Sequence, residues 1–167
     1  QPGAPGSLAD PAFRAGYAKM GKYGLHYDLQ TPWWHLPEAA NLAQDFSETT
    51  IILNHTGLPS DRSATGIARW KAGMEIFAAQ PNTAVKISGI CVPGEKWTAD
   101  LNGEVVLETI RIFGVERCMF ASNFPVDGVV ASYDDIFNGF ADIVSELSEA
   151  DQLKLFHDNA MKYYRPV

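Results

Sequence analysis

The chain has 167 residues, of which 46% are hydrophobic and 20% are charged, and its formal net charge is −7. Because a chain of about 150 residues buries roughly 70% of its unfolded surface, we expect residues 1–167 to form a single domain with its own core. The acidic charge without a cluster of Lys and Arg excludes a nucleic-acid partner, and the lack of an apolar run near the roughly 20 residues of a membrane span excludes a membrane protein.

Residues 13–46 carry the pattern of a helix, a strand and a second helix. Three residues recur at the spacing of one helical face: Phe13, Tyr17 and Met20. Gly24 stands where this helix would end, and the segment 25–30 (LHYDLQ) suits a short strand. The second helix is indicated by four further residues at helical spacing: Ala39, Leu42, Ala43 and Phe46.

The same alternation continues to the end of the chain. Three apolar runs bounded by turn residues suit buried strands: 49–59, 84–90 and 117–122. Helical stripes lie between and after them: Ile67 to Phe77, Val106 to Phe113, Tyr133 to Leu147, and Leu153 to Tyr163. Ser132 and Ser148, each three residues before an Asp, resemble capping boxes. Units of roughly 25 to 35 residues are typical of βαβ crossovers, so the predicted fold class is α/β with a parallel sheet.

His55 is the first candidate for chemistry, because parallel sheets place their functional residues at the carboxyl ends of the strands. It follows a buried run and precedes the turn TGLP (56–59). From there an imidazole can ligate a metal, polarise a carbonyl or move a proton. A buried histidine that the backbone satisfies is the alternative interpretation.

His26 and Asp28 lie two positions apart on one predicted strand, so their side chains share a face. Asp28 can orient His26 or hold a substrate, and it can equally cap the following turn. We keep both residues as candidates for substrate binding.

Lys86 interrupts an apolar strand, where it either pairs with an internal acid or binds an anionic group. Ser88 and Gly89 follow, and their small size lets a ligand approach the backbone. Trp33 belongs to an aromatic loop after the first strand, which either lines a pocket or plugs the underside of the sheet.

Asn123 and Asp127 follow the last predicted strand, in the stretch SNFPVDG (122–128). The neutral amide of Asn123 offers only hydrogen bonds, whereas Asp127 can accept a proton if it points into the cleft. Asn123 would then orient a water or a carbonyl while Asp127, His55 or a residue on an absent segment transfers the proton. A turn-forming role before Gly128 is the alternative for Asp127.

The two cysteines, Cys91 and Cys118, lie far apart in apolar settings, which favours buried free thiols over a disulfide or a metal pair. The opening residues, QPGAPGSLADP, lack the basic start and apolar core of a signal peptide. The free thiols fit a reducing compartment, and the expected location is cytoplasmic.

Three motifs in fixed order carry a resemblance to a known family. The segments IILNHTGLP (51–59), PNTAVKISGI (81–90) and FGVERCMFASNFPVD (113–127) together resemble the last strands of the amidohydrolase-related (β/α)8-barrel hydrolases, in their lactonase branch. The resemblance covers nearly the whole chain from about residue 13. It implies that the four predicted strands correspond to strands five to eight of a TIM barrel.

The resemblance also implies roles for single residues. His55 falls on the strand-six histidine that contacts the substrate carbonyl or a metal, and Lys86 and Ser88 fall beside the substrate. Asn123 falls where many members carry the aspartate that activates water, so the role of general base does not transfer to it. The implied cofactor is a divalent metal such as zinc or none, with His55 as the one metal-ligand candidate.

The family's barrel is about twice as long as this chain, in line with the roughly 250 residues typical of the architecture. A His-x-His pair belongs to its first strand, and this chain has none. Four βα units would leave two open sheet edges and a bare inner face. The expectations are a fragment of a longer enzyme, a pair of copies, or completion by an N-terminal half on another chain.

The functional hypothesis is a hydrolase that opens a lactone, or a similar cyclic ester, by attack of water. The expected partner is a small lactone or carboxylate. Two alternatives stay open: a metal-dependent non-oxidative decarboxylase of the same superfamily, and a catalytically impaired half-barrel that binds a ligand or assembles with a partner.

Overall fold

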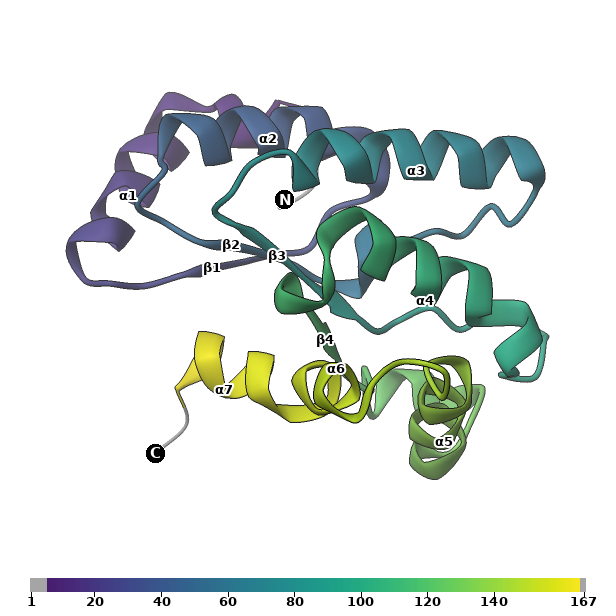
Figure 1. Cartoon of the computed structure of the whole chain (residues 1–167). Coiled ribbons are helices and arrows are strands. Elements are labelled where there is room, and N and C mark those ends of the chain that lie inside the picture. Colours follow the sequence, from purple (N-terminus) through teal and green to yellow (C-terminus); the bar gives the residue numbers. More distant parts are fainter. Residues whose placement is uncertain (1–5, 166–167) are drawn as a thin grey trace.

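The protein, described by a computed structural model over residues 6–165, is built on one sheet of four parallel strands. The strands lie side by side in chain order: β1 (Tyr27–Leu29), β2 (Ile51–Leu53), β3 (Thr83–Ile87) and β4 (Cys118–Phe120). Figure 1 shows the helices that connect them. The predicted α/β class is confirmed, and the arrangement is that of half a TIM barrel. The first five residues of the opening segment lie outside the described range.

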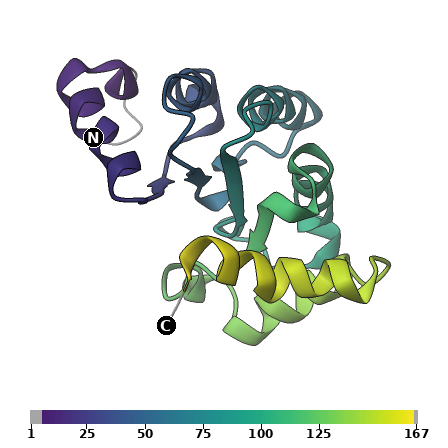
Figure 2. The same cartoon turned by 60° about the vertical axis from the view of Figure 1, so that its left-hand side comes forward.

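Four helices cover one face of the sheet: α1 (Pro11–Lys22), α2 (Leu36–Asp45), α3 (Ala64–Ala78) and α4 (Ala99–Phe113). Figure 2 shows them as an arc outside the strands. The core between these layers takes the strand side chains of one face, among them Leu29, Leu53 and Ile87, and helix residues such as Trp70 and Phe77, all fully buried. This burial explains the helical stripes of the sequence, since each stripe is the face that a helix turns to the sheet.

The first predicted helix ends as its sequence indicates. Gly24 takes φ 62°, a left-handed conformation in which glycine has no steric penalty. The amide of Leu25 then donates to the carbonyl oxygen of Met20 at 3.1 Å. This is the 6→1 bond of a glycine-terminated helix.

Each strand is shorter than its predicted segment, and the last two helices also differ from the prediction. Helix α5 (Tyr133–Ile143) ends before Leu147. The final helix is divided into α6 (Glu149–Leu153), a π-helical turn (Lys154–Asp158) and α7 (Asn159–Tyr164). The Ser132 capping box is confirmed, whereas the Ser148 hydroxyl accepts from the Asp151 amide and donates to the Asp151 carboxylate. Helical spacing alone does not register such a π-turn, because the apolar face continues through it.

The C-terminal helix α7 covers part of the sheet face that α1 to α4 leave open. Ala160 and Tyr163 pack against a small cluster of strand residues on this inner face: Ile52, Ala84 and Met119. The Asn159 amide donates to the carbonyl oxygens of Val115 and Cys118, both at 2.7 Å. These bonds occupy acceptors beside the edge strand β4, which has no further strand beside it among residues 6–165.

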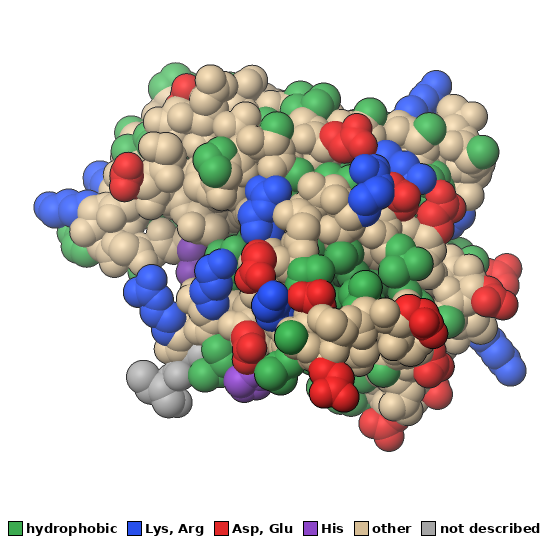
Figure 3. All heavy atoms as spheres, viewed as in Figure 1, with side chains coloured by type: hydrophobic (Ala, Val, Ile, Leu, Met, Phe, Trp, Pro, Cys, Tyr) green, Lys and Arg blue, Asp and Glu red, His purple; other side chains and the backbone are tan. Residues whose placement is uncertain are grey.

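The surface carries mixed charge. Figure 3 shows basic and acidic side chains side by side over α3 and α4, where Lys71 pairs with Glu104 at 3.1 Å and Arg111 pairs with Glu75 at 3.2 Å. No helix within residues 6–165 is long and apolar enough to cross a bilayer. Both cysteines are free, and Cys118 is buried as predicted, but Cys91 is only half-buried because it lies in the loop after β3.

Candidate active site

Four predicted site residues lie at the carboxyl ends of the strands, and we call His55, Ser88, Asn123 and Asp127 the rim cluster. His55 follows β2 and Ser88 follows β3, and the His55 Nδ1 lies 3.0 Å from the Ser88 hydroxyl oxygen. Asn123 follows β4, and its amide nitrogen donates to Asp127 Oδ1 at 2.8 Å. The sheet therefore brings together residues that are up to 72 positions apart in the chain, from His55 to Asp127.

The backbone that carries His55 is strained. Three non-glycine residues take left-handed φ values, namely His55 at 55°, Thr56 at 55° and Leu58 at 56°. Each such residue costs roughly 1–2 kcal/mol, and backbone strain of this kind gathers at functional sites. The indole nitrogen of Trp70 donates to the Thr56 carbonyl oxygen at 2.8 Å and helps to hold the turn.

Gly89 makes room for the imidazole. Its φ is +59°, and a Cβ built there would lie 2.6 Å from His55 Nδ1 and 2.8 Å from the ring carbon Cγ. No L side chain fits that gap without displacing the ring. The sequence predicts that a ligand approaches the backbone here, and in the structure the His55 ring fills this space.

The imidazole of His55 is held in its neutral form. Burial lowers its pKa first, and the positive charge of Lys86 lowers it further, while Asp127 acts in the opposite direction. A neutral ring has one donor and one acceptor nitrogen. If Ser88 donates to Nδ1, the Nε2–H is free to polarise a carbonyl, and if Ser88 accepts, Nε2 is a lone-pair ligand.

Asn123 and Asp127 form a second hydrogen-bonded pair on the rim. Asn123 takes φ 54°, a region that asparagine tolerates better than most residues. Asp127 lies in the short helix Val126–Val129 and is 7% exposed. The hydrogen bond from the Asn123 side-chain amide fixes one carboxylate oxygen of Asp127. The candidate base Asp127 is therefore oriented by Asn123, which stands where the family resemblance places the usual base.

Three other predicted residues belong to a separate group. Asp28 and Lys86 join His26 and the C-terminal Tyr164 in what we call the inner-face cluster. Lys86 Nζ lies 3.1 Å from Asp28 Oδ2, and the Tyr164 hydroxyl donates to Asp28 Oδ1 at 2.8 Å. The ring centroids of His26 and Tyr164 are 4.9 Å apart. The internal pairing considered for Lys86 is therefore present.

Trp33 lies apart from both clusters. It belongs to the 3-10 turn Trp33–His35 and packs on α3, where a Cβ at Gly73 would lie 2.8 Å from the Trp33 carbonyl oxygen. The Trp33 ring contacts that of Trp34 with centroids 5.4 Å apart. The loop of Trp33 turns toward the helix layer, where Trp33 lines a cavity of about 310 Å³ with Arg69 and Ile76 of α3. Substrate binding by Trp33 stays a prediction.

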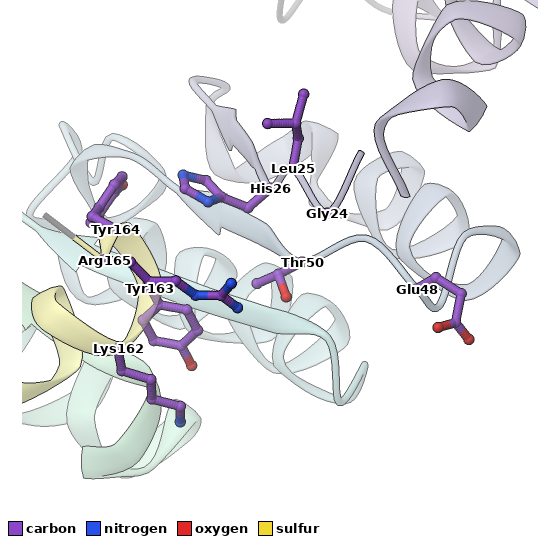
Figure 4. A pocket seen from close by; sticks show the side chains of 9 residues that line it. All are labelled: Gly24, Leu25, His26, Glu48, Thr50, Lys162, Tyr163, Tyr164 and Arg165. Carbon is purple, nitrogen blue, oxygen red and sulfur yellow. The ribbon is translucent and has the colours of Figure 1, made fainter. Parts of the chain in front are cut away.

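A cavity of about 490 Å³ opens at the opposite end of the strands. Figure 4 shows its walls, in which Leu25, His26 and Thr50, all ahead of β1 or β2, face Tyr163, Tyr164 and Arg165 of the C-terminal segment. Chemistry in barrels of this type lies at the carboxyl ends of the strands, so this cavity is a weaker candidate than the rim.

Three structural partners had no clear signal in the sequence. Tyr164 meets Asp28 across 136 residues. Cys91 stands near Asp127, and burial together with that carboxylate raises the pKa of the Cys91 thiol to about 12. Arg62 reaches Ile90 from the loop before α3. An apolar–polar pattern cannot reveal such contacts, because they join segments that are far apart in the chain.

Metal binding was a further prediction for His55. Within residues 6–165 no three His, Cys, Asp or Glu side chains gather closely enough to hold a metal ion. Zinc sites use three or four protein ligands. The described residues therefore do not form a zinc site by themselves.

Known proteins share sequence similarity with most of this chain. Residues 1–165 match the amidohydrolase family model. An uncharacterized Sinorhizobium fredii protein, y4mH, is 43% identical over 93% of this chain and 52% of its own length. An L-fucono-1,5-lactonase of Burkholderia multivorans is 29% identical over 93% of this chain and 56% of its own. The chain thus spans about half the length of these curated relatives.

A solved structure shares the fold of this chain. A crystal structure of a zinc-bound amidohydrolase from Burkholderia multivorans superposes with a TM-score of 0.90 at 25% identity, covering 97% of this chain and 60% of the other. The half-barrel arrangement described above is therefore the same as the matching part of a known fold.

Proposed function

Because this chain belongs to the amidohydrolase family, whose model it matches over residues 1–165, we propose that its rim cluster is the active-site half of a hydrolase that opens a lactone. The observation that carries the proposal is the half-buried His55, whose Nδ1 lies 3.0 Å from the Ser88 hydroxyl on a left-handed turn at the carboxyl end of β2. The L-fucono-1,5-lactonase relative supports a sugar 1,5-lactone as the first substrate class to test.

The proposed chemistry assigns one role to each residue. The Nε2–H of His55, with Ser88 on Nδ1, donates a hydrogen bond to the lactone carbonyl oxygen. Asp127 takes a proton from the attacking water, and Asn123 keeps that carboxylate in place. The new C–O bond forms, the ring C–O bond breaks, and Asp127 returns the proton to the leaving ring oxygen, which leaves a hydroxy acid.

We also propose that further strands complete the barrel around this site. Among residues 6–165, β1 and β4 each have one strand neighbour, and α7 covers only part of the inner face. An open strand edge and a bare inner face favour pairing with more chain. The added strands come either from a second copy or from an N-terminal half.

Native mass spectrometry of the purified protein tests the completion. We expect a mass that is a multiple of 18.3 kDa or that includes a partner chain. A lone 18.3 kDa species with full lactonase activity would show that no completion is needed.

The lactonase proposal is tested by pH-indicator assays of sugar 1,5-lactones with the assembled protein and two Asn→Asp variants. Asn123→Asp removes the amide donor and sets a second carboxylate beside Asp127, so we expect the rate to fall. Asn138→Asp, on the exposed side of α5, is the control and should keep the rate. A large gain from Asn123→Asp would mean that the native protein lacks a base, and no hydrolysis of any lactone by the assembled protein would refute the proposal.

A further inference from the structure

A small cavity of about 90 Å³ opens between the loops that follow β2 and β3, beside the rim cluster. Most of its walls are apolar side chains: Leu58, Pro59, Ile90, Val92 and Pro93. The two prolines have no amide N–H to offer a ligand. A cavity of roughly 150 Å³ holds benzene in an engineered protein core, and a water-sized group takes about 30 Å³. This cavity therefore has room for a methyl or ethyl group and not for an aromatic ring.

The walls of the cavity are held in place from both sides. Leu58 and Gly89 take left-handed backbone, with φ values of 56° and 59°. Arg62 Nη2 donates to the Ile90 carbonyl oxygen at 2.8 Å and so joins the loop after β2 to the loop after β3. The cavity is therefore part of the folded structure of the two loops.

Few hydrogen-bond donors face this space. Arg62 uses Nη2 at Ile90, and its Nε and Nη1 are buried without exposed surface. The Cys91 thiol is a weak donor and stays protonated, because burial and the charge of Asp127 raise its pKa to about 12. Ser60 is exposed and keeps water as a partner. A polar group placed here would lose hydrogen bonds to water, whereas an apolar group gains by leaving water.

The cavity meets the rim cluster at two points. Gly89 lines it, and a Cβ at Gly89 would lie 2.6 Å from His55 Nδ1. Cys91 also lines it and stands near Asp127. The proposed chemistry places the lactone carbonyl at His55 and the ring oxygen at Asp127, which returns a proton to that oxygen. The ring carbon bonded to this oxygen is then the part of the substrate nearest to Cys91 and the cavity.

We propose that this cavity is a specificity pocket that receives a methyl or ethyl substituent on the ring carbon bonded to the lactone oxygen. Its specificity-determining residues are Leu58, Ile90 and Val92, which supply apolar wall. The position of the substituent rests on the proposed function, since it uses the roles of His55 and Asp127. The preference for a small apolar group rests on the size and the walls of the cavity alone.

The first test compares lactones that differ only in this substituent, hydrolysed by the assembled protein. The probes are δ-valerolactone, which has none, δ-hexalactone, which carries a methyl group there, and the analogue with a phenyl group. We expect kcat/KM to rise at least about tenfold from the first to the second, the lower end of the roughly 10–200-fold that one methylene gives in an apolar pocket. It should fall again with phenyl, which exceeds the space. Equal values for all three, or the highest value with phenyl, would overturn the proposal.

Two phenylalanine variants locate the preference in the chain. Val92→Phe fills the pocket, so the ratio of kcat/KM between δ-hexalactone and δ-valerolactone should fall toward one. Leu107→Phe, at a residue of α4 that is 47% exposed, is the control and should keep the native ratio. An unchanged ratio in Val92→Phe would overturn the assignment to this cavity. If Val92→Phe does not fold, Val92→Ala enlarges the pocket and should move the preference to longer substituents.

A binding experiment separates this proposal from the lactonase assignment. The lactam δ-valerolactam and its derivative with a methyl group on the carbon bonded to nitrogen resist hydrolysis, and both are titrated in carbon-13 methyl NMR spectra. We expect the methyl derivative to bind about tenfold more tightly and to shift the methyl signals of Ile90 and Val92. Equal binding of the two lactams, or binding without these shifts, would overturn the pocket.

The two proposals can therefore fail separately. Preferred binding of the methyl lactam without hydrolysis of any lactone would keep the pocket and refute the lactonase assignment. Lactone hydrolysis with no preference for the methyl group would do the reverse.

Discussion

The rim cluster and the inner-face cluster are both polar groups on the same sheet, yet they satisfy their polar atoms in different ways. In the inner-face cluster, Asp28 binds Lys86 through one oxygen and Tyr164 through the other. In the rim cluster, His55 and Asn123 stand on left-handed backbone, and the hydrogen bond recorded for the His55 ring within residues 6–165 uses only one of its two nitrogens. Spare hydrogen-bonding capacity on strained backbone indicates chemistry, whereas mutual pairing indicates a structural role.

The largest effect should come from His55→Asn. Asparagine tolerates the left-handed turn, but it has no ring nitrogen at the position of Nε2. We expect the rate of lactone hydrolysis to fall by about 10²–10³-fold, the usual loss when one hydrogen-bond donor to a developing oxyanion is removed. His35→Asn, in the turn before α2, is the control. Similar losses in both variants would mean that the loss of activity is not specific to the rim cluster.

Gly89→Ala should destabilise the rim cluster, because Gly89 leaves the space that the His55 ring occupies. The new Cβ would lie 2.6 Å from His55 Nδ1 on a backbone with φ +59°. We expect the free energy of unfolding to fall by about 2–5 kcal/mol, from roughly 1–2 kcal/mol of backbone strain and roughly 1–3 kcal/mol of overpacking. Urea unfolding of the native protein and the variant measures this change in the free energy of unfolding.

Gly16→Ala is the matched control for that substitution. Gly16 lies in α1 with open space around its Cβ position, so alanine should raise stability by up to about 1 kcal/mol. A loss of stability in Gly16→Ala, or none in Gly89→Ala, would contradict the assignment of Gly89 as the support of His55.

Tyr164→Phe examines the inner-face cluster. The change removes the hydroxyl that donates to Asp28 and keeps the ring beside Lys86 and His26. We expect stability to fall by about 0.5–1.5 kcal/mol, the net contribution of one hydrogen bond, and lactone hydrolysis to be unchanged. Tyr23→Phe, at a residue that is 68% exposed, should change neither quantity. A large loss of activity in Tyr164→Phe would place the inner-face cluster in the active site.

The smallest effect should be a pH dependence from His55. Its folded pKa lies below the unfolded value of 6.5, so the unfolded chain binds more protons between the two values. The stabilisation is complete above pH 6.5 and is lost as the pH falls from there to the folded pKa. Urea unfolding across this range should show the loss, and His55→Asn should show less of it. Equal pH dependence in both proteins would mean that His55 does not carry a lowered pKa.

The sequence predicts the elements well where burial dictates the pattern. The helical stripe from Ile67 to Phe77 becomes α3, and the apolar run before His55 becomes β2, because each buries one repeating face. The prediction overestimates strand length, since the turn at His55 to Leu58 depends on left-handed backbone that periodicity does not encode.

The site is predicted less completely than the fold. His55 and Asp127 stand out because they follow buried runs, which places them at the carboxyl ends of strands. The pairing of Asp28 with Tyr164 and the unpaired donors of Arg62 depend on the folded positions of loops and of α7. Trp33 is a candidate because its aromatic loop follows the first strand, and the packing of that loop on α3 is not encoded in the sequence pattern.

The most direct test makes the same isosteric substitution in both clusters. Asp127→Asn and Asp28→Asn each replace one carboxylate with an amide, and both lactone hydrolysis and thermal stability are measured for each. We predict that Asp127→Asn loses at least about 10²-fold in kcat/KM with its Tm nearly unchanged, and that Asp28→Asn keeps its activity with a lower Tm. The reverse result, an active Asp127→Asn and an inactive Asp28→Asn, would contradict the assignment of catalysis to the rim.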